Sequence, residues 1–374
     1  MDLLLRPAWG GVDLGAIRDN TRVLADRAAP AALLAVVKAD AYGHGAIQVA
    51  RAVLDGGASW LGVATVREGI DLRSRGITAP IMLLSEPPEL AGPAVVARRL
   101  TPIVYRAPGI EALAKAVADA GTGEALAVHL KVDTGMHRVG CAPAEALALA
   151  RLVHERAELK LEGVCTHLAI ADEPESSFTS EQLDCFDDLV AALRREGLAP
   201  QIVHAANSAG LLAHPRARYD LVRIGIALYG IAPAPVLAGI VPLRPALSVK
   251  ARVTYVQQLP AGTRVSYGLR YELPAAARIA TVPIGYADGV PRNLGLRGGE
   301  VIVRGRRRPI AGSVTMDQLM VDVGDDLVEV GDEVVLLGRQ GDEEITADEW
   351  AARLGTIAYE VISGIGPRIP RRYT

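Results

Sequence analysis

The segment Leu33-Leu34-Ala35-Val36-Val37-Lys38 places a lysine at the end of an apolar run, and the chain then turns through Ala39-Asp40-Ala41-Tyr42-Gly43-His44-Gly45. A short, continuous aliphatic run is typical of a parallel strand that is buried on both faces. We therefore expect Lys38 at the rim of a sheet, held by rigid backbone. An amine held in this way forms Schiff bases with carbonyl compounds when its pKa is lowered from the free value of about 10.4. A surface lysine that merely ends a strand is the plainer alternative.

Seven more apolar runs follow, with amphipathic helical patterns between them. The eight predicted strands are residues 33–37, 60–64, 81–84, 101–105, 127–132, 161–165, 201–204 and 221–224. One intervening helix is predicted to begin at Thr179, as its N-cap, with Glu181 in the first turn. This alternation predicts an α/β fold, a (β/α)8 barrel of the TIM type. A doubly wound sheet is the alternative, but no Gly-x-Gly-x-x-Gly motif follows a strand to support it.

The pattern of the sequence changes near residue 243. Residues 249–256 alternate between apolar and polar side chains, and further short strands are predicted at 278–284, 301–303, 320–323 and 333–337. Only residues 347–354 have a helical pattern in this region. We expect residues 11–242 to form the barrel and residues 243–374, joined by 1–10, to form a mostly β domain after a proline-rich linker.

The composition argues against several classes of function. The 374-residue chain has a formal net charge of −3 and no basic run longer than Arg306-Arg307-Arg308, which is not the pattern of a nucleic-acid-binding protein. Residues 224–243 are uncharged, but glycines and prolines interrupt them, so they do not predict a membrane span. The three cysteines lack Cys-x-x-Cys spacing, which fits a reducing compartment. We expect a soluble, cytoplasmic protein without a metal site.

Polar side chains follow the predicted strands where each one ends. They are Lys38, Lys131, Asp133, Arg138, His167, Asn207, Ser208 and Arg223, and after the eighth strand Gly225 and Ile226 offer close backbone approach. Barrels of this type build their active sites at the carboxyl ends of the strands, and phosphate groups often bind near the last two strands at a helix N-terminus. A phosphate site opposite a Schiff-base lysine describes pyridoxal 5′-phosphate. A sugar-phosphate aldolase shares both features but does not need a second domain.

Longer motifs identify a resemblance to a known family. Segments 35–45, 131–138, 204–208 and 222–230 in the barrel are followed by Val265-Ser266-Tyr267-Gly268, Gly285-Tyr286-Ala287-Asp288-Gly289, Met316-Asp317-Gln318 and Tyr359-Glu360. Together they resemble the alanine racemases, pyridoxal-phosphate enzymes built from a barrel and a β domain. One departure is Thr315, where relatives often have cysteine.

The resemblance implies two catalytic bases, because racemisation removes the Cα proton from one face and returns a proton to the other. Lys38 is implied as the cofactor's attachment point and first base, and Tyr267 of the partner subunit as the second. A free tyrosine keeps its proton until about pH 10, so a neighbouring donor must favour its phenolate. We hypothesise that Tyr267, His167 and Arg223 form one hydrogen-bonded chain. Arg223 is also implied at the cofactor's ring nitrogen, where it leaves that nitrogen neutral.

The remaining implied roles concern the phosphate and the substrate. The expected phosphate site consists of Tyr42, Asn207, Ser208, Gly225, Ile226 and Tyr359. The substrate carboxylate is expected at Arg138 and at the backbone near Met316 and Asp317, since arginine pairs bidentately with carboxylates. Met316, Tyr286 and Tyr359 are expected to narrow the pocket to a methyl side chain. Lys131 is either carbamylated, as in relatives, or ion-paired with Asp133 or another carboxylate.

These expectations describe a homodimer with shared active sites that interconverts L- and D-alanine and supplies D-alanine for peptidoglycan. A racemase with a broader range, including serine, is one alternative. A non-catalytic carrier of pyridoxal phosphate is another, although such carriers resemble the barrel alone. A decarboxylase is disfavoured, because Arg223 at the ring nitrogen would not create the strong electron sink that decarboxylation needs.

Overall fold

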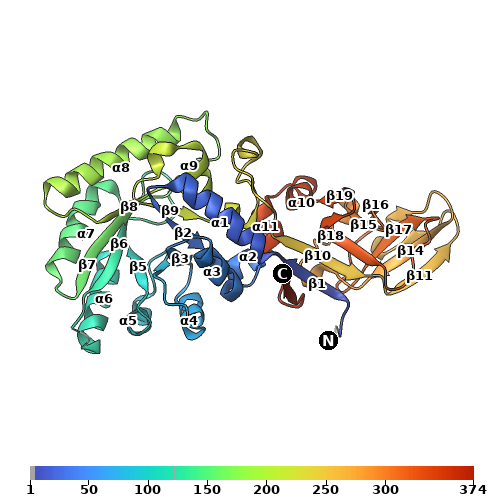
Figure 1. The fold of residues 1–374 in the computed structure, drawn as a ribbon, viewed down its shortest axis with the longest axis horizontal. Helices are drawn as coiled ribbons and strands as arrows, with labels where there is room; N and C mark the ends of the chain where they lie inside the picture. The colour runs from blue at the N-terminus through green and yellow to red at the C-terminus, as the bar shows by residue number, and fades with distance from the viewer. Residues whose placement is uncertain (1–4, 122) are drawn as a thin grey trace. The chain divides into compact units, whose positions relative to one another are not determined.

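The computed structural model describes residues 5–121 and 123–374 of the chain (Figure 1). The chain divides into two compact units. The first, called here the barrel unit, contains Gly15–Ala41 and Ala46–Arg244, and the second, the β unit, contains the N-terminal stretch through Leu14, Tyr42–Gly45 and Pro245–Thr374. The short helix α2 (Lys38–Gly43) therefore supplies Lys38 to one unit and Tyr42 to the other.

The barrel unit is built on eight parallel strands in the order β8-β7-β6-β5-β4-β3-β2-β9. Their bounds are β2 Ala32–Val36, β3 Trp60–Val63, β4 Ile81–Leu83, β5 Thr101–Val104, β6 Leu126–Lys131, β7 Leu159–Cys165, β8 Ile202–His204 and β9 Leu221–Ile224. Backbone hydrogen bonds from Asp220 N to Val203 O (3.0 Å) and from Arg223 N to Ala206 O (2.9 Å) connect the last strands, so the sheet is nearly closed. The predicted barrel is confirmed, and the doubly wound alternative is wrong.

Helices lie around the outside of these strands (Figure 1). They are α1 Leu14–Ala28, α3 Ala46–Asp55, α4 Val66–Ser74, α5 Gly92–Ala97, α6 Ala107–Ala120, α7 Pro143–Glu155, α8 Phe178–Arg195 and α9 Ser208–Ala213. The prediction that Thr179 caps α8 is wrong, because the helix already begins at Phe178 and the Thr179 side chain is fully buried within it. Ser177 precedes the helix, and its Oγ donates to Glu181 Oε1 (2.8 Å).

The β unit contains one large and two small sheets. The large sheet has the order β16-β15-β18-β10-β1-β20, with β19 paired to β18. Its strands are β16 Arg306–Pro309, β15 Glu300–Val303, β18 Glu333–Gln340, β10 Leu247–Arg252, β1 Ala8–Val12, β20 Arg371–Tyr373 and β19 Glu343–Ile345. The small sheets comprise β11 Tyr255–Leu259, β14 Ala277–Val282 and β17 Leu319–Gly324, and the hairpin of β12 Arg264–Val265 with β13 Tyr271–Glu272.

The strand predicted at 249–256 is divided in two. Val253 N bonds to Asp332 O, whereas Thr254 N bonds to Thr281 O, so the chain leaves the large sheet at this point and enters a small one. The helix predicted at 347–354 is present as α10 (Ala347–Leu354), but a second helix, α11 (Ala358–Ser363), was not predicted. Six residues give less than two turns, which is too short for a helical period to show in the sequence.

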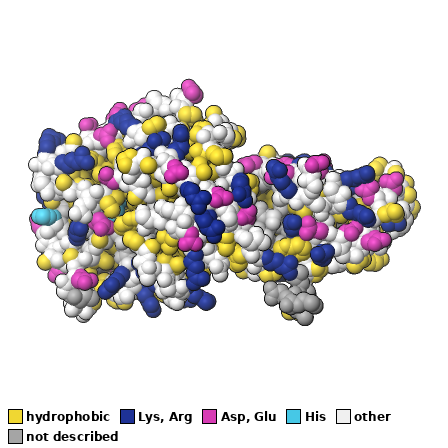
Figure 2. All heavy atoms as spheres, in the orientation of Figure 1, with side chains coloured by type: hydrophobic (Ala, Val, Ile, Leu, Met, Phe, Trp, Pro, Cys, Tyr) yellow, Lys and Arg dark blue, Asp and Glu magenta, His cyan; other side chains and the backbone are white. Residues whose placement is uncertain are grey.

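Among the described residues no helix is long and apolar enough to cross a membrane. Basic and acidic side chains are interspersed over the face shown in Figure 2. The same part of the chain contains no group of three or more side chains suited to hold a metal ion.

Candidate active site

Lys38 is followed by a backbone turn of the opposite hand to an ordinary helix. The φ angles of Ala39, Asp40, Ala41 and Tyr42 lie between 52° and 54°, which is the left-handed region. Each such residue costs about 1–2 kcal/mol. Side chains hold both ends of the turn: Glu68 Oε1 accepts from Ala39 N (2.7 Å), and Asp40 Oδ1 accepts from Ala46 N (2.7 Å). The amine is therefore carried by a strained but anchored segment.

Four cationic side chains lie at or near the carboxyl ends of the barrel strands: Lys38, Lys131, Arg138 and Arg223. Burial lowers the pKa of Lys38, and Arg138 lowers it further, although Glu68 acts in the opposite direction. Burial likewise lowers the pKa of Lys131 to about 8, and both arginines contribute. Cations that lower one another's pKa form a site that favours binding of an anionic ligand.

Arg223, on β9, is buried and connects several neighbours. Its Nη2 donates to Thr166 O (2.8 Å) and Ala205 O (2.9 Å), and its Nη1 lies 2.8 Å from His204 Nδ1. Nη2 also lies 3.2 Å from His167 Nδ1. Because a guanidinium only donates, His167 Nδ1 is the acceptor, and a neutral ring then carries its proton on Nε2. Burial and the charge of Arg223 hold the pKa of His167 well below its usual value, which fits the neutral ring.

The loops after β8 and β9 are joined through two short polar side chains. Asn207 Oδ1 caps α9 by accepting from Gly210 N (2.8 Å), and Ser208 Oγ accepts from Gly225 N (3.1 Å) and Ala227 N (3.5 Å). These side chains shape the loops. The amides of the first turn of α9 and of Ile226 have no acceptor one turn earlier, so backbone N–H groups are what this surface offers to an anion.

Asp133 does not pair with Lys131. Its Oδ1 accepts from the backbone amides of Gly135 and His137, each at 3.0 Å, and its Oδ2 faces the His137 ring. Among the described residues, Lys131 has no ion-pair partner, and its side chain is buried. The salt-bridge alternative for Lys131 is therefore not found.

The other predicted site residues belong to the β unit. Tyr42 and Tyr359 have ring centroids 6.3 Å apart, and burial raises the pKa of Tyr42 to about 12. Tyr267, Tyr286 and Met316 are instead exposed, with relative accessibilities of 68%, 40% and 52%. All three side chains are therefore accessible on the surface of the β unit.

A buried carboxylate, missed by sequence reasoning, holds the loops of Tyr286 and Met316. Asp288 is inaccessible to solvent and accepts from both terminal nitrogens of Arg6, at 2.7 and 2.6 Å. Arg368 lies 3.4 Å from the same carboxylate and donates to Asp317 Oδ1 (2.6 Å). The backbone amides of Met316 and Asp317 donate to no acceptor among the described residues. The residues of this network are far apart in the sequence, so no local pattern indicated it.

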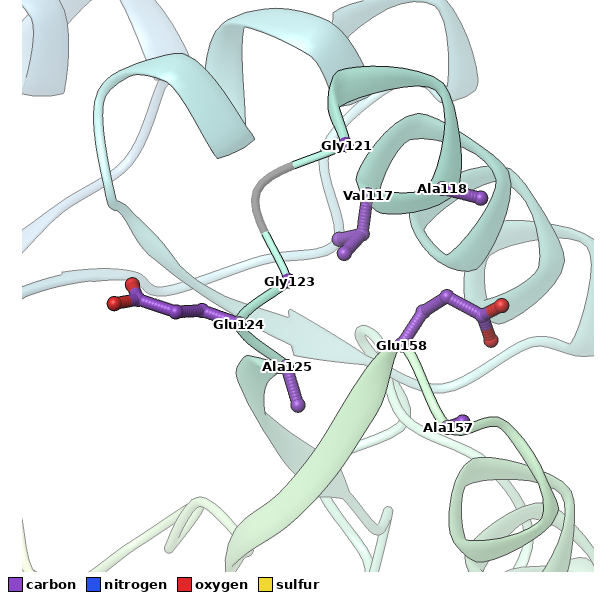
Figure 3. Close-up of a pocket in the computed structure, with 8 residues that line it drawn as sticks. All are labelled: Val117, Ala118, Gly121, Gly123, Glu124, Ala125, Ala157 and Glu158. Carbon is purple, nitrogen blue, oxygen red and sulfur yellow. The ribbon is translucent and has the colours of Figure 1, made fainter.

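A separate cavity of about 360 Å³ lies near the amino ends of β6 and β7 (Figure 3). Its charged lining residues are Glu124 and Glu158, whose carboxylates point away from each other. Binding sites need convergent polar groups. This cavity lies at the opposite end of the strands from Lys38, and its charged side chains do not converge on a binding position.

Comparison with known proteins agrees with this geometry. Two family models match, "Alanine racemase, N-terminal domain" over residues 12–233 and "Alanine racemase, C-terminal domain" over residues 246–373. The alanine racemase of Symbiobacterium thermophilum is 50% identical, and the match covers 99% of this chain and 97% of the relative. Among solved structures, the alanine racemase of D-cycloserine-producing Streptomyces lavendulae aligns with a TM-score of 0.93 at 41% identity, over 99% and 97% of the two chains.

A histidine racemase from Leuconostoc mesenteroides also aligns, with a TM-score of 0.91 at 31% identity over 99% of this chain and 98% of the other. A parallel barrel with a lysine at the end of β2, followed by a mostly β region, together with these matches, defines an amino-acid isomerase. The chain belongs to the alanine racemase family, whose members depend on pyridoxal 5′-phosphate.

Proposed function

We propose that this protein interconverts L- and D-alanine by a two-base mechanism with Lys38 and Tyr267, using pyridoxal 5′-phosphate. The observation that carries the proposal is the placement of Lys38, an amine of lowered pKa, among cations at the carboxyl ends of the barrel strands. Supply of D-alanine for peptidoglycan, in the cytoplasm, is part of the same proposal.

The residues present fit this cofactor. Backbone amides at Ser208 and Ile226 suit its phosphate, with Asn207 and Gly225 shaping the loops of the barrel unit. Tyr42 and Tyr359, whose ring centroids lie 6.3 Å apart in the β unit, stay predicted phosphate ligands. Arg223 offers only N–H donors, so it suits a neutral ring nitrogen. When bound, the cofactor supplies a conjugated ring that stabilises negative charge at the substrate Cα.

Two side chains move the proton in this proposal. The Lys38 amine takes the Cα proton on one face or returns it there, and Tyr267 of the partner subunit does the same on the other face. The Nε2–H of neutral His167 donates to the Tyr267 oxygen and favours its phenolate form. His167 is in turn held by Arg223, as the 3.2 Å contact supports.

The substrate is held by its carboxylate. Arg138 supplies a planar pair of donors, and the amides of Met316 and Asp317 of the partner subunit supply two more. We propose that Lys131 is carbamylated, because a buried amine with a pKa near 8 is partly neutral at physiological pH and a carbamate would balance the neighbouring Arg138. Tyr286, Met316 and Tyr359 limit the side chain that enters.

The decisive experiment uses the cofactor-loaded protein with L-alanine in heavy water. NMR follows deuterium at Cα while chiral chromatography follows D-alanine. We expect deuterated alanine that approaches equal amounts of both enantiomers. Deuteration without inversion would rule out Tyr267 as the second base, and no exchange would favour another substrate or a carrier.

The substrate range is a second question, because a histidine racemase shares this fold. Serine, histidine and alanine should be compared in the same assay. We expect alanine to be converted with the highest kcat/KM, since three large side chains narrow the proposed pocket. A faster reaction with serine or histidine would establish the broader racemase.

His167→Leu tests the chain of hydrogen bonds to Tyr267. Without the Nε2–H donor the phenolate is less stabilised, so the acidic limb of the pH–rate profile should move to higher pH. His154→Leu, an exposed position on α7, is the control and should leave the profile unchanged. An unchanged profile in His167→Leu would contradict the proposed chain.

A further inference from the structure

A second row of buried side chains begins at Arg223 Nη1, whereas His167 is contacted by Nη2. Arg223 Nη1 lies 2.8 Å from His204 Nδ1, and His204 Nε2 lies 2.9 Å from His129 Nδ1. His129 Nε2 then lies 3.2 Å from Glu162 Oε2. Both histidines are fully buried, and the four residues come from four adjacent strands, β9, β8, β6 and β7.

The hydrogen bonds along this row can run in only one direction, because Arg223 at one end only donates and the Glu162 carboxylate at the other end accepts. Arg223 can only donate, so His204 Nδ1 accepts and the neutral ring carries its proton on Nε2. That proton is donated to His129 Nδ1, which leaves the His129 proton on Nε2, facing the carboxylate of Glu162. Each of the four ring nitrogens of the two histidines then has a hydrogen-bond partner. Burial lowers the pKa of both histidines, which agrees with two neutral rings.

The backbone makes room for this arrangement. In the pairing of β6 with β7, Val128 is opposite Leu161 but His129 is opposite Gly163, so Glu162 is an extra residue at a bulge. Bulges re-aim side chains. A Cβ atom at Gly163 would lie 2.2 Å from His129 Nδ1, so only glycine leaves space for the ring.

We propose that Glu162, His129 and His204 are positioning residues for Arg223. The carboxylate fixes the proton on His129, His129 fixes it on His204, and His204 presents an acceptor that prevents the guanidinium from turning away from the cofactor's ring nitrogen and from His167. The effect on catalysis rests on the proposed function. The predicted proton positions on His129 and His204 do not depend on the proposed function.

The test is long-range ¹H–¹⁵N NMR of the cofactor-loaded protein labelled at the histidine ring nitrogens, with racemase kinetics in parallel. We expect His129 and His204 each to show a protonated Nε2 and an unprotonated Nδ1. Glu162→Gln can still accept through its amide oxygen and should keep this pattern. Glu162→Leu should lose the single pattern at His129 and lower kcat for alanine about tenfold, with a smaller change in KM.

Glu158→Leu, just before β7 and outside the row, is the matched control and should change neither measurement. A protonated Nδ1 on either histidine of the wild-type protein would overturn the proposal. So would a Glu162→Leu protein whose histidine pattern and kcat match the wild type. If the predicted pattern is present but alanine is not racemised, the row stands and the proposed function fails.

Discussion

Lys131 shows how burial changes the acid–base equilibrium of a single side chain. It lies at the end of β6, its pKa is lowered to about 8, and no described carboxylate neutralises it. Only the neutral amine reacts with carbon dioxide, and the neutral fraction of an amine grows as the pH rises through its pKa. The amount of carbamate should therefore increase as the pH rises through the pKa of Lys131.

We predict that carbamate formation at Lys131 increases between pH 7 and pH 9. It can be measured by NMR after addition of ¹³C-bicarbonate. Lys131→Met should abolish the signal, whereas Lys115→Met, which removes an exposed lysine paired with Asp119, should not. A signal that persists in Lys131→Met would assign the carbamate to another lysine.

At the scale of elements, the left-handed turn after β2 combines strain with anchoring. Alanine in this region lacks the freedom of glycine, so Ala39 at φ 52° is strained. Its amide is nevertheless fixed by Glu68, which also closes the capping box of α4 with Thr65. One carboxylate therefore stabilises two elements.

We predict that Ala39→Gly is neutral or raises the free energy of unfolding by up to about 1 kcal/mol, because it relieves the strain. Ala118→Gly, at an exposed position in the right-handed helix α6, should lower it by about 1 kcal/mol. Urea denaturation compares the two. Equal losses in both variants would show that Ala39 is not strained.

The Asp288 network gives a second prediction at this scale. Asp288→Ala leaves Arg6 and Arg368 without their shared carboxylate, and loss of these charge-assisted hydrogen bonds costs about 1–3 kcal/mol. Urea denaturation should show this loss. Asp342→Ala, at an exposed turn, should change stability by less than about 0.5 kcal/mol. Similar stabilities for the two variants would contradict the structural role of Asp288.

The sequence predicted elements whose signal is local. The barrel strands were recognisable because short aliphatic runs repeat at regular intervals, and the lysine and arginine positions followed from the strand ends. The left-handed turn was not predictable, because Ala, Asp and Tyr give no sign of positive φ. The Glu162–His129 contact depends on a bulge, and the Arg6–Asp288 pair on residues 282 positions apart, so neither has a local pattern.

At the scale of the whole molecule, Tyr267, Tyr286 and Met316 are exposed on the β unit. A twofold dimer would let each copy complete the barrel site of the other. We predict that mixing Tyr267→Ala chains with Lys38→Ala chains restores part of the activity, since a heterodimer contains one intact site. Each variant alone should be inactive. Verified heterodimers without activity would contradict shared sites.

The position of β1 has a consequence for synthesis on the ribosome. Gly10 pairs with Val249 on one side and with Arg371 on the other, so β1 is flanked by strands that are synthesised much later than β1 itself. At about 5–20 residues per second, Gly10 waits roughly 10–50 s for its first neighbour. Nascent chains thus expose an unpaired edge of β1 until Arg371 has been synthesised, and we expect chaperones that shield such edges to bind β1 during this time.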